Sequence, residues 1–248
     1  MGLFAHHCNG GQGKPFCPPY KTLDCGRIMS SNNKSTEPEN FMESKAHWDQ
    51  VYSTKAVDAV SWFQTHADDS LRFLQKTGVD LTAAIIDVGG GASTLVDDLL
   101  SLGYKKVTVL DIAEQALSAS KTRLGARAGQ VNWLVADITN AELPAQSVDV
   151  WHDRAVFHFL TAANDRKAYI QNMRHTLKPN SHAIIATFAE NGSLKCSGLE
   201  IVRYSASSLQ AELGESFELI ASEKVLHLTP SNKAQQFVYC QFRKLSNK

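Results

Sequence analysis

The amino-acid sequence predicts an α/β fold built on a doubly wound, mostly parallel sheet of seven strands, preceded by helices and ending in an antiparallel hairpin. Three observations carry this prediction. Strand-like and helix-like segments alternate after Gly78, which is typical of a parallel sheet. A run of glycines follows the first strand-like segment and leads directly into a helix-like one. The last two strand-like segments have only a short polar stretch between them.

The composition is that of a globular protein with a sizeable core. Of the 248 residues, 43% are hydrophobic and 20% are charged, which is ordinary for a soluble domain. Lys and Arg number 25, as do Asp and Glu, so the bulk charge gives no reason to expect binding to nucleic acid or to an anionic membrane. No run of about 18 apolar residues is present, so we expect no membrane-spanning helix.

The cysteines bear on the compartment and on metal binding. Five widely spaced cysteines suit free thiols in a reducing compartment, so we expect a cytoplasmic protein. Targeting to an organelle stays open, because the N-terminal segment holds few acidic residues. We expect no metal site, because no CxxC pair occurs in the one group of candidate ligands, His6, His7, Cys8, Cys17 and Cys25.

Two regions are predicted along the chain. Residues 1–42 are expected to be a disordered tail, because the stretch from Ser30 to Asn40 has almost no apolar side chains to offset the entropy of ordering. Residues 43–248 are expected to form a single domain.

The domain is expected to begin with two helices that end near Gly78. Trp48 and Tyr52 are four residues apart, and Leu71 and Leu74 are three apart, so each pair lies on one helix face. We expect strands at residues 83–88, 106–110, 131–136, 148–152 and 183–188. We expect helices between and after them at residues 93–102, 113–124, 164–177 and 206–213.

The C-terminal part breaks the alternation. The stretches SFELIASEKVLHL and AQQFVYCQFRK are strand-like and are joined by TPSNK. Because no helix separates them, they are predicted to pair as an antiparallel hairpin on one edge of the sheet.

A glycine turn joins the first strand to its helix in the segment DVGGGAS. Gly89 and Gly91 match the first two glycines of the GxGxxG nucleotide-binding pattern, whereas Thr94 stands at the third position. Such a turn aims a helix N-terminus at a ligand. A match to two of the three glycines does not by itself identify the ligand, so the acids that accompany the turn are needed for that assignment.

Three acids, Asp87, Asp111 and Asp137, end three successive strands. The carboxyl ends of the strands line the ligand crevice of a doubly wound sheet, so these carboxylates are expected to face one cleft. Asp111 is placed to accept hydrogen bonds from ribose hydroxyls, and Asp137 from an exocyclic amine such as that of adenine. Asp87 would repel a phosphate at the helix N-terminus and suits an ammonium or cationic group. The alternative is that each acid merely caps the next helix.

In order and spacing, DVGGGAS, VTVLDIA, LVADIT and HTLKPNSHAIIATF resemble the motifs of class I S-adenosylmethionine-dependent methyltransferases. The resemblance covers roughly residues 46–244 and implies a Rossmann-like fold. It implies S-adenosyl-L-methionine as the cofactor, an adenosine whose positively charged amino-acid tail suits all three acids.

The segment HWDQVYSTKAVDAVSWF also resembles the lid of this family. The resemblance implies that its aromatic side chains shield the methyl donor from water; otherwise they are core residues of an amphipathic helix. The cofactor contacts that we expect are Trp48, Tyr52, Trp62, Asp87, Gly89, Gly90, Gly91, Ser93, Asp111, Ile112, Asp137, Ile138 and Asp153.

The methyl acceptor is expected over the stretch DRAVFHFLTAANDRKAYIQNM. This stretch is similar to part of the thiopurine S-methyltransferases and to the Asp-Lys-Gly stretch of small lysine methyltransferases, although Ala155 replaces the glycine of both. By position, Asp153 and Arg154 follow the fourth strand and border the sulfonium, with Arg154 orienting an anionic acceptor. His158 is the candidate general base. Alternatively, Asp153 and Arg154 form a structural pair and His158 packs under a loop; His152 is expected to be structural.

The stretch NGSLKCSGLEIVRYS is expected to be a loop at the active site. Cys196 lies in it, with Lys195 beside it and Arg203 downstream, and a nearby cation would lower the pKa of its thiol. Cys196 could contact the substrate, or it could be an ordinary loop residue without such a role; the sequence leaves both possibilities open.

The sequence therefore predicts methyl transfer to a small-molecule nucleophile, with a thiol favoured because thiols ionise without a strong base. A small-molecule acceptor is favoured over a protein, because His158 stands where lysine-modifying relatives tend to have an acid. A protein-lysine N-methyltransferase and a non-catalytic cofactor-binding scaffold remain as alternatives. The oligomeric state is not indicated.

Overall fold

The computed structural model describes residues 39–246. The expected tail therefore lies almost wholly outside the described residues, as do the N-terminal histidines and cysteines that were weighed as metal ligands. The first helix, α1 (Glu39–Thr54), begins at Glu39, so the expected boundary at residue 43 falls inside a helix. The end of the polar stretch before it is thus helical, because it continues into the amphipathic turns that carry Trp48 and Tyr52.

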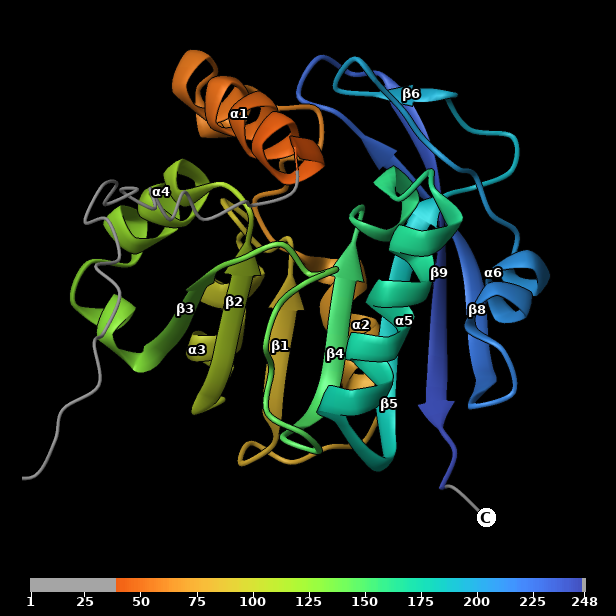
Figure 1. Cartoon of the computed structure of the whole chain (residues 1–248). Helices are drawn as coiled ribbons and strands as arrows, with labels where there is room; N and C mark the ends of the chain where they lie inside the picture. The colour runs from red at the N-terminus through yellow and green to blue at the C-terminus, as the bar shows by residue number, and fades with distance from the viewer. Residues whose placement is uncertain (1–38, 247–248) are drawn as a thin grey trace, which may run out of the picture. The chain divides into compact units, whose positions relative to one another are not determined.

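The seven-stranded, mostly parallel sheet is confirmed (Figure 1). Its strand order is β3-β2-β1-β4-β5-β9-β8, and β9 alone of these seven strands runs opposite to the others. The strands are β1 (Ala84–Val88), β2 (Lys106–Asp111), β3 (Val131–Val135), β4 (Val148–Arg154), β5 (Leu177–Phe188), β8 (Phe217–Leu228) and β9 (Ala234–Lys244).

The C-terminal hairpin is also confirmed. β9 pairs antiparallel with β5 on one side and with β8 on the other, which leaves β8 at the edge of the sheet. A separate two-stranded hairpin, β6 (Lys195–Cys196) and β7 (Leu199–Glu200), forms in the stretch that was expected to be a loop. Its short strands reverse at Ser197 and Gly198, both with positive φ, so a tight turn replaces an open loop.

Helices cover both faces of the sheet in two separate cores. One core packs α2, α3 and α4 against the sheet, and the other packs α5 and α6 against the opposite face. Figure 1 shows α5 in front of the strands, with α2 and α3 behind them. The helices of these layers are α2 (Asp68–Lys76), α3 (Leu95–Leu102), α4 (Glu114–Leu124), α5 (Ala163–Thr176) and α6 (Ala206–Leu213).

One boundary, the end of β4, differs from expectation in a way that affects the site. β4 extends to Arg154, because Asp153 and Arg154 continue the ladder opposite Ile185 and Ala186 of β5. The two residues therefore belong to the strand instead of following it. The extended pairing fixes the direction in which both side chains leave the sheet.

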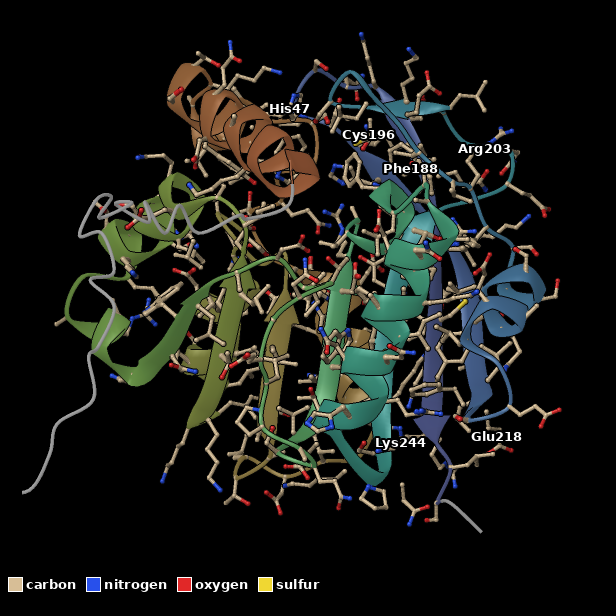
Figure 2. All side chains as sticks on the ribbon, viewed as in Figure 1. His47, Phe188, Cys196, Arg203, Glu218 and Lys244 are labelled. Atoms are coloured by element: carbon tan, nitrogen blue, oxygen red, sulfur yellow. The ribbon has the colours of Figure 1, made fainter. Side chains whose placement is uncertain are left out.

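Helix α1 lies beyond the carboxyl ends of β1 and β2, and β6 lies at the same end of the molecule (Figure 1). In Figure 2, His47 of α1, Cys196 of β6 and Phe188 at the end of β5 gather at this end. Lys244 and Glu218 lie at the opposite end, where the Lys244 ammonium donates to the carbonyls of Arg174 and Leu177 and so caps α5. The end of the sheet that holds His47, Phe188 and Cys196 is thus separate from the end at which Lys244 caps α5.

Candidate active site

A cavity of about 690 Å³ opens at the carboxyl ends of the parallel strands, beneath α1. This volume is in the range of small-molecule and cofactor sites. Its wall includes Val88, Gly89, Leu110, Asp111, Ile112, Asp137 and Ile138 on one side, and Arg154, Phe159, Phe188, Cys196, Gln235 and Phe237 on the other. A small compartment adjoins it and is lined by Asp87, Gly89, Gly90, Ser93 and His152 among others.

The glycine turn after β1 is folded tightly against two acids. The amides of Gly89 and Gly90 both donate to the carbonyl of Leu110, 2.7 and 3.2 Å away, which holds the turn against the end of β2. A Cβ on Gly90 would lie 2.5 Å from Oδ2 of Asp87, and one on Gly91 would lie 2.5 Å from Oδ2 of Asp111. Only a hydrogen atom fits in either place, so the glycines let the backbone approach both carboxylates.

Asp111 ends β2 and lies almost completely buried on the cavity wall. Its Oδ1 accepts a hydrogen bond from the amide of Ala113, 2.8 Å away. Burial, and to a lesser degree the negative charges of Asp87 and Asp49, raises the pKa of Asp111 to about 7. The side chain is therefore poised to ionise near neutral pH, at a place where a ligand can donate hydrogen bonds to it.

Asp87, in β1, is buried beside the small compartment. Its Oδ1 contacts Nδ1 of His152 at 2.7 Å, and Nε2 of His152 contacts the hydroxyl of Ser70 at 2.9 Å. Its Oδ2 is buried and has no hydrogen-bond partner among the described residues. A buried carboxylate oxygen without a donor is costly, so this atom calls for one from a ligand.

Asp137 follows β3 and lines the cavity with Ile138. Both hydrogen bonds from Thr139, from its amide and from its hydroxyl, reach the same oxygen, Oδ1, at 2.8 Å. The acids expected to share a cleft are thus brought to the carboxyl end of the sheet. Asp111 and Asp137 line the large cavity, and Asp87 lines the compartment that shares Gly89 with it.

The expected aromatic lid lies over the cavity. Trp48 and Tyr52 share one face of α1, as predicted, and they line the cavity together with Trp62. The ring centroid of Trp62 lies 5.8 Å from that of Trp48 and 6.0 Å from that of Tyr52, and the rings meet edge to face. Trp48 also packs at 5.1 Å against Phe159, so the lid contacts the segment after β4.

Arg154 is the cation on the cavity wall. Its guanidinium donates to the carbonyl of Trp62 at 3.0 Å and to the hydroxyl of Tyr239 at 3.1 Å. It also lies 4.8 Å from the ring centroid of Phe237. Among the side chains of residues 44–246 no carboxylate lies within ion-pair distance of it, so its charge faces the cavity with neutral partners in this part of the chain.

Asp153 and His158 lie behind the wall and do not line the cavity. Asp153 accepts hydrogen bonds from the Tyr169 hydroxyl at 2.6 Å and from the amides of Val156 and Phe157. Burial raises its pKa to about 6, in spite of these donors. The structural Asp153–Arg154 pair that was considered as an alternative does not form, because adjacent strand residues point to opposite faces of the sheet.

His158 is completely buried between Phe159 and Phe188. Its Nδ1 accepts a hydrogen bond from the amide of Phe188, 3.3 Å away. Burial, and then the charge of Arg154, lowers its pKa to about 3. Its position matches the packing alternative more closely than that of a base exposed to a substrate.

Cys196 lines the cavity, but its ionisation is opposite to expectation. Burial raises the pKa of the thiol to about 11, although a hydrogen bond with Ser197 and the charge of Arg154 oppose the shift. The desolvation of the thiolate exceeds the attraction of the cation. Arg203, the other cation considered, instead donates to the carbonyl of Gly192.

Several wall residues were not foreseen. Phe188, Gln235 and Phe237 come from β5 and β9, and they enter the site because β9 inserts beside β5. The sequence assigned the aromatic residues of AQQFVYC only to a hairpin. It did not indicate where in the sheet that hairpin lies.

Among the described residues, no three His, Cys, Asp or Glu side chains form a group that could hold a metal ion. No helix in this part of the chain is long and apolar enough to cross a membrane.

Comparison with known proteins agrees with this geometry. A methyltransferase domain model matches residues 85–180. EEF1A lysine methyltransferase 2 of Homo sapiens is 22% identical over 208 residues, which cover 77% of this chain and 82% of that protein. N-terminal Xaa-Pro-Lys N-methyltransferase 1 of Rattus norvegicus is 26% identical over 197 residues, covering 71% and 86%.

Among solved structures, the 1,6-didemethyltoxoflavin-N1-methyltransferase of Burkholderia thailandensis has a TM-score of 0.60 at 18% identity, covering 84% of this chain and 86% of that one. It is described with bound 1,6-didemethyltoxoflavin and S-adenosylhomocysteine. A protein described in connection with conversion of a disulfide bond into a thioacetal group during echinomycin biosynthesis has a TM-score of 0.68 at 18% identity, covering 82% and 93%. The domain match, the relatives and the fold support one assignment: the chain is a class I S-adenosylmethionine-dependent methyltransferase.

Proposed function

We propose that this enzyme binds S-adenosylmethionine through the three strand-end acids and transfers its methyl group to a small anionic nucleophile, with a thiolate as the favoured acceptor. The observation that carries the choice of acceptor is Arg154, a half-buried cation on the cavity wall without a carboxylate partner among the described residues.

The cofactor assignment rests on a fit between the site and the chemistry of the ligand. Asp111 and Asp137 offer acceptor oxygens for ribose hydroxyls and for an exocyclic amine, and Oδ2 of Asp87 offers one for an ammonium group. The glycine turn leaves room that any Cβ would fill. When bound, the cofactor supplies a methyl group already activated by a positively charged sulfur.

The tasks that remain for the protein are to align the acceptor with the methyl group, to exclude water and to favour the nucleophilic form of the acceptor. Trp48, Tyr52 and Trp62 close the cavity and keep water out. The acceptor side is walled by Phe159, Phe188 and Phe237, which suit an apolar molecular body. Arg154 lies among these rings, and its field lowers the pKa of an acid bound beside it.

Neither His158 nor Asp153 is placed to act as a base on the acceptor, so the site favours an acceptor that needs no protein base. His158 is neutral at physiological pH and lies away from the cavity, and Asp153 is fully engaged by three donors. A thiol has an ordinary pKa of about 8.5, so part of it is already thiolate in water near neutral pH, and the charge of Arg154 favours this form when the acceptor binds beside it. We therefore propose that Arg154 binds and orients the acceptor, and that Asp153 supports the wall of the cavity.

Protein-lysine methylation is the second candidate, and it is supported by the acceptors named for the curated relatives. The aromatic rings of the lid and Glu200 on the cavity wall would suit a lysine side chain. Arg154 opposes this candidate only through repulsion, because a lysine reaches the site as an ammonium of like charge; once the lysine is bound, the same cation would favour loss of its proton. Proteins that share the fold act on both kinds of acceptor, so the fold alone does not choose between them.

A labelling experiment tests the proposal. The protein is incubated with S-adenosylmethionine carrying a labelled methyl group, and with either a panel of small thiols or a protein extract. We expect label in low-mass products, with carboxylated thiols used better than neutral thiols of the same size. Label confined to a protein band would instead establish the lysine candidate, and no transfer with any acceptor would leave the cofactor-binding scaffold.

Arg154→Lys and Arg154→Met provide the matched pair for this experiment. Lysine keeps the charge but not the planar fork, and methionine removes the charge at similar length. We expect the preference for carboxylated over neutral thiols to survive in part in the lysine variant and to vanish in the methionine variant.

We also propose that the protein is cytoplasmic. The thiols of Cys196 and Cys240 are free, and free thiols suit a reducing compartment.

A further inference from the structure

Ser70, His152 and Asp87 form a buried hydrogen-bonded chain next to the small compartment, and methyl transfer as described above makes no use of its first two members. We propose that His152 is a positioning residue that orients the carboxylate of Asp87 toward the ammonium group of the methyl donor, and that Ser70 fixes the ring of His152 for this task. The inference rests on the proposed binding of S-adenosylmethionine.

The sheet itself sets up the contact between the acid and the histidine. β1 and β4 run parallel side by side, and the Cα atoms of Asp87 and His152 are direct partners in their register. Their side chains therefore leave the same face of the sheet and meet at 2.7 Å between Oδ1 and Nδ1. Both are nearly inaccessible, with relative exposures of 2% and 3%, so the hydrogen bond is not weakened by competition with water.

The histidine occupies one oxygen of Asp87 and leaves the other one free. Oδ2 is buried, has no partner among the described residues and faces the turn, where a Cβ at Gly90 would lie 2.5 Å from it. A side chain held only through Oδ1 presents Oδ2 in a fixed direction. An ammonium group carries three donors and a positive charge, so it satisfies both the unpaired oxygen and the uncompensated charge.

Ser70 is placed to favour the tautomer of His152 that donates to Asp87. The serine hydroxyl, from α2, lies 2.9 Å from Nε2 and is 1% exposed. When this hydroxyl donates to Nε2, the neutral ring has its proton on Nδ1 and donates it to Asp87. With the opposite tautomer, the lone pair of Nδ1 would face the carboxylate and repel it. The serine thus acts on the donor site through the histidine.

Two isosteric variants separate this role from simple packing. His152→Asn places an amide nitrogen where Nδ1 lies and keeps a donor for Asp87, whereas His152→Gln places its polar atoms nearer to Ser70 and loses that donor. The measurement is the dissociation constant of S-adenosylhomocysteine and of its deaminated analogue, in which hydrogen replaces the amino group. Their ratio isolates the ammonium contact and does not depend on turnover.

We expect the original protein to prefer S-adenosylhomocysteine over the deaminated analogue by about tenfold or more, as for one charge-assisted hydrogen bond. The asparagine variant should keep most of this preference, and the glutamine variant should reduce it to about threefold or less. The same preference in both variants, or an equal loss of affinity for both ligands, would overturn the inference.

Ser70→Ala decides the matter if the glutamine variant does not fold, because it removes a single hydroxyl. We expect the preference to fall by about threefold, because Nε2 loses its hydrogen-bond partner and the ring of His152 is held less firmly beside Asp87. A preference equal to that of the original protein would contradict the role of the chain. Failure of the original protein to bind S-adenosylhomocysteine at all would contradict the proposed cofactor instead, so the two failures are distinguishable.

Discussion

A Cβ placed on Gly91 would lie 2.5 Å from Oδ2 of Asp111, so the turn after β1 and the acid that ends β2 approach each other as closely as two chain segments can. The φ angle of Gly91 is positive, at 23°, which also favours glycine. This close approach explains why a glycine-rich turn and an acid 20 residues after Gly91 occur together in the sequence.

Gly91→Ala is therefore expected to displace Asp111 and to weaken binding of S-adenosylhomocysteine by at least about tenfold. Stability should fall by about 1 to 3 kcal/mol, because the added methyl group overpacks a buried site. Gly129→Ala is the control, since a Cβ there meets no atom within 4 Å. Calorimetric titration and thermal melting check both values, and equal behaviour of the two variants would contradict the explanation.

Affinity for S-adenosylhomocysteine is expected to depend on pH through Asp111. Its pKa is raised to about 7, so the carboxyl is mainly neutral below that pH and ionised above it. If the ionised form is the one that accepts both ribose hydroxyls, affinity should fall by about tenfold from pH 8 to pH 6. Titration at several pH values tests this, and Asp111→Asn should bind more weakly but without this dependence.

The same residue is expected to lower the stability of the ligand-free protein at alkaline pH. A carboxyl whose pKa is raised on folding stabilises the folded state below its unfolded pKa of 3.8, and this contribution is lost as the pH rises through about 7. Asp111→Asn should therefore raise the free energy of unfolding at pH 8 by about 1 to 3 kcal/mol. Denaturant unfolding at pH 5 and pH 8 is the check, and an equal effect at both would be inconsistent with burial of the charge.

Ala155 adopts a left-handed conformation, with φ at 74°, at the position where the similar families have glycine. The methyl group of alanine costs about 1 kcal/mol in this conformation. Ala155→Gly should therefore stabilise the protein by about 0.5 to 1 kcal/mol. Ala145→Gly is the control, because Ala145 is an exposed turn residue whose φ is not positive, and it should gain nothing. Destabilisation by the first change would show that the methyl group packs favourably.

His158 is expected to contribute no ionisation to the rate between pH 5 and 9. Its pKa of about 3 leaves it neutral throughout that range, and its ring lies behind Phe159 and Phe188. His158→Gln should lower kcat by less than about tenfold, in contrast to the 10²-fold or larger loss that follows removal of a general base. If the variant removed an inflection from the pH–rate profile, His158 would be restored as the base.

The alternation of strands and helices and the placement of the three acids follow from short-range features of the sequence. Asp87, Asp111 and Asp137 each end a strand, and parallel strands bring such ends to one edge. The hairpin of β8 and β9 was likewise evident from the lack of an intervening helix. These features depend on periodicity and chain direction, which are local properties.

The acceptor side could not be predicted to the same degree, because it depends on contacts between distant segments. Phe237 comes close to Arg154 only after β9 inserts beside β5, and no local pattern specifies that insertion. The burial of His158 depends on how Phe188 packs over it. The pKa of Cys196 depends on the balance of desolvation against a cation, which is known only once the packing is known.

The central claim, that the three acids and the glycine turn form a site for S-adenosylmethionine, is tested most directly by thermal melting with S-adenosylhomocysteine. At a ligand concentration about 100 times the dissociation constant, binding adds about 2.7 kcal/mol to the stability, and the melting temperature should rise by several degrees. The shift should disappear in Asp111→Asn at the same concentration. An unchanged melting temperature of the original protein at about 1 mM ligand would contradict the claim.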